Sequence, residues 1–231
     1  MESKPYDQWY GNWTYFLVAT LIFGVFTLAL LRPRKKKDWQ GAGVLQTFFI
    51  SLFAEMFGFP LTIFLFSSTF GGTYKRFGLF ESHLWPYLIS KLGVMNLESA
   101  VGLVMWVSIV LVVAAFVLIA WGWVQIYRAK GGLVTTGIYR IVRHPQYLGL
   151  ILIILGFNIQ WPTVPTLVMS PILILIYLRL ARVEEGELEG EFGHLYKAYR
   201  GRVHAFIPLC ESDINELRAT NKDQVFCGGK T

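Results

Sequence analysis

Residues 146–178 read QYLGLILIILGFNIQWPTVPTLVMSPILILIYL, which is 33 consecutive residues without a charged side chain. One straight helix of this length would be about 50 Å long, whereas about 20 residues suffice to cross a hydrocarbon core of roughly 30 Å. The tripeptide Gln160-Trp161-Pro162 places a turn signal inside the stretch. We therefore predict two short legs that form a helical hairpin, with both ends on the same side of a membrane.

Three further apolar segments precede the hairpin, at residues 11–31, 44–66 and 99–127. The first follows the aromatic residues Trp9 and Tyr10, which are typical of a membrane interface, and it ends in a basic cluster. We interpret it as a retained span, because a cleavable signal peptide has the opposite order of features. The segments together predict an all-α, polytopic integral membrane protein with about five transmembrane helices.

Composition and charge agree with a membrane protein. Hydrophobic residues make up 54% of the 231 residues and charged residues 16%, against about 25% charged in soluble proteins. This excludes a disordered chain, a disulfide framework and a coiled coil. The net charge of +6 comes in blocks at the ends of apolar runs. The positive-inside rule then predicts an outer N-terminus and a cytosolic C-terminus, and it explains the blocks better than nucleic-acid binding does.

The same pattern divides the chain into three parts. Residues 1–98 form an N-terminal transmembrane pair and an outer loop, residues 99–209 form the core of the protein, and residues 210–231 form a polar, flexible tail. Cys210 and Cys227 lie in this tail without a partner at zinc-ligand spacing, so we interpret both as free cytosolic thiols.

Polar residues that can carry chemistry are concentrated on the two sides of the hairpin. Before it, residues 131–149 contain Arg143-His144-Pro145, and Pro145 suits the first turn of a helix. Arg143 and His144 then lie at a helix N-terminus, which favours an anion. After the hairpin come Arg179, Arg182 and the pair Glu184-Glu185. Because the hairpin returns to its starting side, we expect the two segments to be neighbours in one cytosolic site.

Simpler explanations exist for each of these residues. The arginines can be positive-inside anchors, and the glutamates can be the solvated start of a helix. Glu55 lies in the middle of a predicted span, where a carboxylate is either functional or hydrogen-bonded to another helix. The sequence has no dinucleotide-binding glycine motif, P-loop or nucleophile elbow, and its histidines have no metal-ligand spacing, so we predict no metal site.

Residues 132–149 closely resemble the cofactor-loop signature of the integral-membrane methyltransferases typified by isoprenylcysteine carboxyl methyltransferase, a phospholipid-methyltransferase-like family. The Arg-His-Pro-x-Tyr core is matched by Arg143-His144-Pro145-Gln146-Tyr147 and the Glu-Glu pair by Glu184-Glu185. The Phe-Gly-x-x-Tyr-x-x-Tyr element is matched at residues 192–199 and the terminal Ile-Pro at residues 207–208. These matches cover residues 131–208, a third of the chain.

The resemblance implies S-adenosylmethionine as the methyl donor, bound in a cytosolic pocket. Four residues would line its adenosine side, namely Leu133, Val134, Gly137 and Tyr139. The methionine part would be held at Arg143, His144, Pro145 and Tyr147, and Glu184 and Glu185 would complete the pocket. Arg179 or Arg182 would orient an anionic acceptor beside Glu185, and the sequence leaves open which of the two arginines does so.

The resemblance further implies methyl transfer to a lipophilic or lipidated acceptor that enters from the bilayer. An isoprenylcysteine carboxylate, a lipid amine and a lipophilic thiol all stay open, because residues 1–98 match nothing in the family. An NADPH-dependent sterol-type reductase, which carries a similar Arg-His-Pro-x-Tyr element, is one alternative. A non-enzymatic membrane protein that handles heme or lipid is the other.

Overall fold

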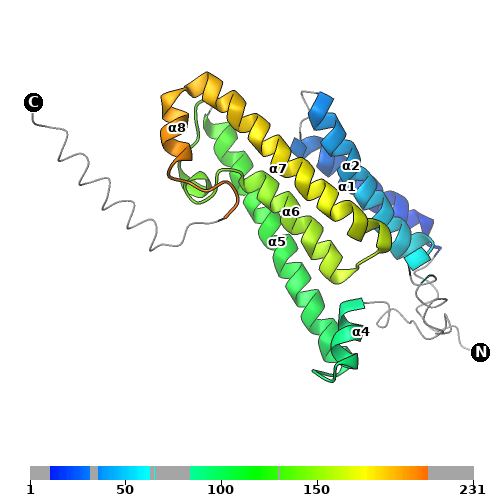
Figure 1. Ribbon diagram of the computed structural model, residues 1–231. Coiled ribbons are helices and arrows are strands. Elements are labelled where there is room, and N and C mark those ends of the chain that lie inside the picture. The colour runs from blue at the N-terminus through cyan, green and yellow to red at the C-terminus, as the bar shows by residue number, and fades with distance from the viewer. Residues whose placement is uncertain (1–10, 32–35, 63–64, 66–83, 130, 208–231) are drawn as a thin grey trace, which may run out of the picture. The chain divides into compact units, whose positions relative to one another are not determined.

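The computed structural model describes residues 11–31, 36–62, 65, 84–129 and 131–207. Some of the sequence interpretations concern residues outside these ranges, namely Trp9, Tyr10, the two cysteines, most of the outer loop and residues 210–231. Within them every regular element is a helix (Figure 1). The elements are α1 (Trp13–Leu31), α2 (Lys36–Phe53), the π-helix η2 (Ala54–Gly58), α4 (Leu84–Lys91), α5 (Leu97–Ala129), the 3-10 helix η4 (Gly137–Arg140), α6 (Pro145–Gln160), α7 (Val164–Phe192) and α8 (His194–Arg200).

The predicted all-α class is confirmed for the described residues. Three helical segments are long and apolar enough to cross a membrane: Gln40–Gly58, Leu97–Ala129 and Val164–Phe192. Two shorter apolar helical segments, Trp13–Ala29 and Pro145–Gln160, coincide with the other predicted spans. At about 1.5 Å per residue, the 16 residues of α6 reach about 24 Å, less than a full hydrocarbon core. Five complete crossings therefore stay a prediction.

The helical hairpin is present as predicted. α6 ends at Gln160, α7 begins at Val164, and residues 161–163 form the turn between them. The Thr163 backbone N–H donates to Thr166 Oγ1 at 3.1 Å, which satisfies a donor at the start of α7. The second leg is longer than the apolar pattern, because α7 continues through the charged residues up to Phe192. It ends before Gly193, whose φ of +53° lies in the left-handed region.

The second predicted span, residues 44–66, is interrupted at residues 59–60, and Leu61, Thr62 and Leu65 are helical again. α2 passes into the π-helix η2 at Ala54, and the helix stops at Gly58 because Phe59 is extended, as the residue before a proline usually is. Glu55 is buried, and its carboxylate accepts hydrogen bonds from the Thr62 N–H and Oγ1, both at 3.0 Å. The partner of Glu55 is therefore Thr62, a helical residue that follows the break at Phe59 and Pro60.

The chain forms two compact units. Unit 1 consists of Met1–Ala114 and Ile151–Leu180, and unit 2 consists of Ala115–Leu150 and Ala181–Thr231. The core of unit 1 is a cluster of phenylalanine rings from α1, α2, η2 and α6. Phe23 lies 4.5 Å from Phe49 and 5.9 Å from Phe157, measured between ring centroids. Ser108 Oγ donates to Gly156 O at 2.9 Å, which links α5 and α6 within this unit.

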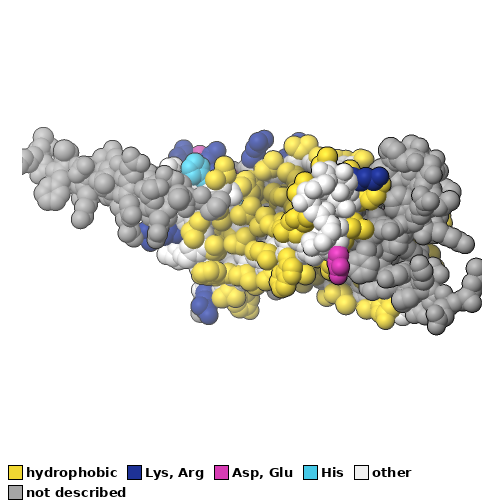
Figure 2. Space-filling view, turned by 90° about the horizontal axis from the view of Figure 1, so that it is seen from below, with side chains coloured by type: hydrophobic (Ala, Val, Ile, Leu, Met, Phe, Trp, Pro, Cys, Tyr) yellow, Lys and Arg dark blue, Asp and Glu magenta, His cyan; other side chains and the backbone are white. Residues whose placement is uncertain are grey.

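Large apolar side chains are exposed along the candidate spans. On α5 they include Leu103, Trp106, Val110, Val113, Val117 and Trp121. Figure 2 shows one face of the molecule on which hydrophobic side chains cover most of the described surface, while Lys and Arg side chains lie toward its margins. An apolar surface of this extent is expected where the solvent is lipid.

Candidate functional site

The two polar segments predicted to be neighbours meet within unit 2. α6 begins at Pro145, so Arg143 and His144 directly precede the helix, and Leu148 N–H donates to His144 O at 3.0 Å in its first turn. Glu185 lies on the part of α7 that belongs to the same unit. Arg143 Nη2 is 2.8 Å from Glu185 Oε1, and His144 Nε2 is 3.0 Å from the same oxygen.

Glu185 is the centre of this cluster. Its side chain is 7% exposed, and its second oxygen, Oε2, lies 3.5 Å from Arg200 Nε. A buried carboxylate is tolerated only when it is paired and hydrogen-bonded, and three partners from two segments meet this condition here. The glutamate pair is divided between two environments, because the Glu184 side chain is 46% exposed.

His144 is neutral at neutral pH. Burial of the ring lowers the pKa of His144, and this effect exceeds the opposing hydrogen bond to Glu185. An ion-paired carboxylate only accepts hydrogen bonds, so Nε2 carries the proton and donates it to Glu185. The unprotonated Nδ1 then faces Glu184 Oε2 at 3.8 Å. Two acceptors therefore face each other, an arrangement that suits a hydrogen-bond donor placed between them.

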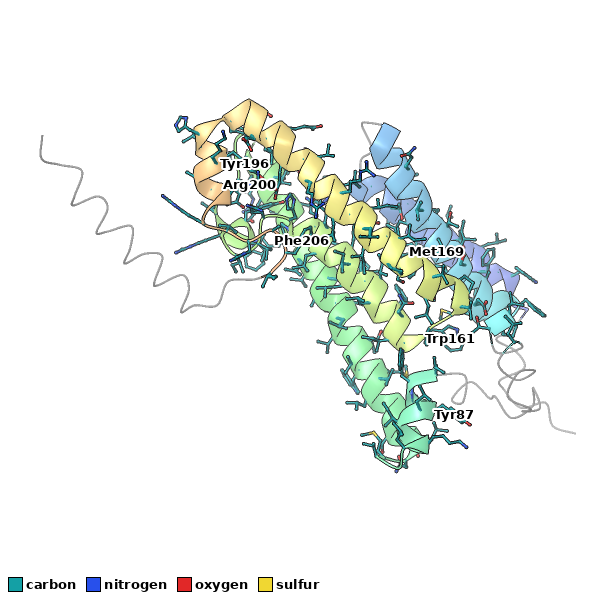
Figure 3. The ribbon with its side chains drawn as sticks, viewed as in Figure 1. Tyr87, Trp161, Met169, Tyr196, Arg200 and Phe206 are labelled. Atoms are coloured by element: carbon teal, nitrogen blue, oxygen red, sulfur yellow. The ribbon has the colours of Figure 1, made fainter. Side chains whose placement is uncertain are left out.

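The chain after α7 closes over this cluster. The N–H groups of Arg143 and His144 donate to the carbonyls of His204 and Ala205 at 2.9 and 3.1 Å. Arg143 Nη1 donates to Arg200 O at 2.8 Å, and the Phe206 ring stacks on His144 with the centroids 5.7 Å apart. Figure 3 labels Arg200 and Phe206, which come from α8 and from the segment that follows it. The free N–H groups before α6 are thus used by the protein's own backbone.

Two tyrosines of α8 pack into an apolar cluster beside these charges. Tyr196, Tyr199 and Val203 are buried, and Leu133, Leu188 and Phe192 pack against them. Tyr199 donates its hydroxyl proton to Tyr139 O at 2.6 Å. Burial raises the pKa of Tyr196 to about 12 and that of Tyr199 further, so both hydroxyls are protonated. Among the described residues, Tyr196 Oη and Arg143 Nε are buried without a hydrogen-bond partner.

The residues predicted to line the adenosine side lie in the loop before α6. Leu133 packs on the tyrosine cluster, whereas Val134 packs on a second cluster formed by Ile138, Tyr139 and Val142. Gly137 has a φ of +61°, and a Cβ there would lie 1.5 Å from Gln125 Nε2. Gln125 Oε1 in turn accepts from the Ile138 N–H at 3.1 Å. Glycine is therefore required at residue 137 by the local packing itself.

The remaining predicted residues have different positions. The Tyr147 ring centroid lies 5.8 Å from that of His144. Arg179 and Arg182 are exposed on α7, and neither forms a hydrogen bond or ion pair with another described residue. The structure thus brings together Arg143, His144, Pro145 and the glutamate pair and leaves the two arginines on the surface. The site also contains Gln125, Arg200 and Phe206, which the sequence pattern did not indicate. Tyr196 and Tyr199 were matched in sequence, but no role in the site was predicted for them.

The arrangement is suited to binding a charged small molecule and to excluding water. It combines a buried ion cluster, a neutral imidazole, an apolar loop and two donors without an acceptor. No group of three or more His, Cys, Asp or Glu side chains within the described ranges could hold a metal ion. The site therefore offers positions for both the charged and the apolar parts of one ligand.

The chain is similar in part to known proteins. Residues 95–194 match the family model of phospholipid methyltransferase. The protein-S-isoprenylcysteine O-methyltransferase of Schizosaccharomyces pombe is 40% identical over 78 residues, which is 33% of this chain and 33% of that protein. Probable protein-S-isoprenylcysteine O-methyltransferases of Oryza sativa, subspecies indica and japonica, are 30% identical over 86 residues, which is 37% of this chain and 45% of theirs.

The matched stretch thus spans between a third and half of the length of these relatives. No solved structure matches the chain. The site residues Arg143, His144, Glu184 and Glu185 all fall within the stretch that the family model matches. Residues 95–194 therefore carry a domain of the phospholipid methyltransferase family, and about a third of the chain is distantly homologous to isoprenylcysteine O-methyltransferases.

Proposed function

We propose that this protein transfers the methyl group of S-adenosylmethionine to a lipophilic acceptor at the membrane interface. The observation that carries the proposal is the buried cluster of Arg143, His144 and Glu185, which lies inside the domain shared with membrane methyltransferases. Bound S-adenosylmethionine supplies a methyl group that is already electrophilic. The protein then needs to hold, align and desolvate the reactants and needs no nucleophile of its own.

The residues fit the chemical groups of this donor. Its ammonium group needs acceptors, which His144 Nδ1 and Glu184 Oε2 offer from facing positions. Its carboxylate needs donors, and Arg143 Nε–H is a buried donor without a partner in the described part of the chain. Its adenine needs an apolar surface, which Leu133 and Val134 supply between two buried clusters. Gly137, Tyr139, Pro145 and Tyr147 form the rest of the loop and helix start that would surround the donor.

We further propose the acceptor class and the membrane arrangement. A lipidated or lipid-like acceptor is supported by the similarity to isoprenylcysteine O-methyltransferases and by the apolar surfaces of α5 and α7. Its isoprenylcysteine carboxylate, lipid amine or thiol would meet the donor near the start of α6. An anionic acceptor would be attracted by Arg182 or Arg179, which are both exposed and form no ion pair with another described residue. Residues 99–209 would be the methyltransferase core, with the N-terminus outside and residues 210–231 as a cytosolic tail.

The proposal is tested by calorimetric titration of the detergent-purified full chain with S-adenosylhomocysteine, with NADPH titrated in parallel. Saturable binding of S-adenosylhomocysteine together with no binding of NADPH is the expected result. Saturable binding of NADPH alone would replace the proposal with the reductase, and binding of neither compound would remove the support for a nucleoside-containing donor. A His144→Ala variant should bind S-adenosylhomocysteine more weakly while it keeps its helical content.

A further inference from the structure

Two buried hydrogen-bond donors in the site have no acceptor among the described residues. Tyr196 is 1% exposed, and its hydroxyl has no hydrogen-bond partner among the described residues. The Arg143 side chain is 11% exposed, and its Nε–H is buried and equally unpartnered. Both atoms carry a proton to donate. What the cluster lacks is therefore an acceptor, because a buried donor without a hydrogen-bond partner destabilises the protein.

The neighbouring tyrosine makes the contrast clear. Tyr199 lies one helical turn further along α8, in the same apolar cluster and with its ring centroid 6.0 Å from that of Tyr196. Its hydroxyl donates to Tyr139 O at 2.6 Å and so fixes α8 to the loop before α6. Packing alone explains the ring of Tyr196, which phenylalanine would fill as well, but packing does not explain its hydroxyl.

The charges around Tyr196 indicate what the acceptor is. Its hydroxyl lies close enough to two cations, Arg143 and Arg200, and to two carboxylates, Glu185 and Glu184, for each charge to influence the pKa of Tyr196. Glu185 is already hydrogen-bonded to His144 and forms ion pairs with Arg143 and Arg200, so its charge is compensated inside the protein. An additional oxygen acceptor beside a guanidinium N–H and a hydroxyl is bound best when it is anionic, as a carboxylate is.

We infer that the Tyr196 hydroxyl and Arg143 Nε–H bind the carboxylate of the amino-acid portion of the methyl donor. This inference rests on the proposed function and adds a ligand-contacting residue that lies beyond the boundary of the matched domain, which ends at residue 194. It also divides the site by charge. The donors Tyr196 and Arg143 would take the carboxylate, while Glu184 and His144 would take the ammonium group.

The test compares Tyr196→Phe with Tyr199→Phe, using two ligands and isothermal titration of the full chain in detergent. The ligands are S-adenosylhomocysteine and its decarboxylated analogue, in which hydrogen replaces the carboxylate and the amine is kept. Tyr196→Phe should weaken S-adenosylhomocysteine binding roughly 10- to 100-fold, because a buried hydrogen bond to a charged group is lost. Its affinity for the decarboxylated analogue should equal that of the wild type.

A melting experiment without ligand separates binding from a structural role. Tyr196→Phe should melt at the wild-type temperature or above it, because it removes an unpaired hydroxyl, whereas Tyr199→Phe should melt lower, because it breaks the bond to Tyr139 O. Equal affinity of Tyr196→Phe and wild type for S-adenosylhomocysteine, as expected if only water meets the hydroxyl, would overturn the inference and leave the proposed function standing. An equal loss for both ligands would also overturn it. A wild type that binds no S-adenosylhomocysteine would remove the proposed function and this inference together.

Discussion

At the scale of single residues, Glu185 joins two segments of the site that lie far apart in sequence. It lies 41 residues from His144, and a single oxygen, Oε1, is hydrogen-bonded to His144 and ion-paired with Arg143. Glu185→Gln should lower the free energy of unfolding by about 3–5 kcal/mol, because the buried arginine then loses its counter-charge. Denaturant unfolding in detergent measures this, with Glu191→Gln as the control, since Glu191 is exposed on the same helix. Equal effects of the two changes would show that the buried ion pair contributes nothing.

His144 gives the site a defined response to pH. Burial lowers its pKa below the ordinary value of 6.5, so the unfolded chain takes up this proton before the folded protein does. The stability contributed by neutral His144 is therefore complete above about pH 6.5 and is lost as the pH falls from there through the folded pKa. Melting curves between pH 5 and pH 8 should show wild type losing stability relative to His144→Gln on acidification. A constant difference between the two proteins across this range would contradict the assignment.

At the scale of elements, close approach of α5 and α6 within unit 2 depends on Gly149. A Cβ at residue 149 would lie 2.5 Å from Ile119 Cγ1 and 2.9 Å from Ala115 O. Gly149→Ala should therefore cost about 1–3 kcal/mol through overpacking. Gly186→Ala on α7, where a Cβ meets nothing within 4 Å, should instead be neutral or stabilising by about 0.5–1 kcal/mol. Unfolding of both variants measures the contrast, and a harmless Gly149→Ala would show that the helices have room to separate.

The hairpin was predictable from sequence because both signals for it lie within its own stretch of the chain. An uncharged stretch too long for one crossing and a turn signal at Gln160-Trp161-Pro162 determine α6 and the start of α7. The meeting of Arg143 with Glu185 follows from that topology alone. The lengths of α2 and α7 were not predictable in the same way. The first depends on the extended residue Phe59 before Pro60, and the second depends on the left-handed Gly193.

The part of the site contributed by α8 could not be predicted from spacing. Arg200 and Phe206 reach the cluster only because the chain turns back at Gly193 and because Arg143 and His144 bond to the His204 and Ala205 carbonyls. Backbone pairing of this kind leaves no mark in the pattern of apolar residues. The unpaired hydroxyl of Tyr196 is likewise visible only in three dimensions, since its sequence spacing resembles that of the hydrogen-bonded Tyr199.

At the scale of the whole molecule, the pattern of basic residues predicts which side of the membrane each loop faces. The charge pattern places Leu92 outside and Arg182 in the cytosol, and both side chains are exposed in the structure. Single cysteines at residue 92 or 182, in a chain with Cys210→Ser and Cys227→Ser, can be labelled with a membrane-impermeant maleimide. Intact cells should be labelled at residue 92 only, and permeabilised cells at both. Labelling of residue 182 in intact cells would reverse the proposed orientation and move the site to the outer side.

Methyl transfer itself is tested most directly with the full chain reconstituted in lipid nanodiscs. S-adenosylmethionine with a radiolabelled methyl group is supplied together with a prenylated cysteine, an amine-bearing phospholipid or a lipophilic thiol. Label is expected in the organic phase with one of these acceptors and should be strongly reduced in Glu185→Gln, and release of the label by mild base identifies a carboxyl ester. No label above the Glu185→Gln background with any of the three acceptors, in a protein that binds S-adenosylhomocysteine, would contradict methyl transfer to a lipophilic acceptor.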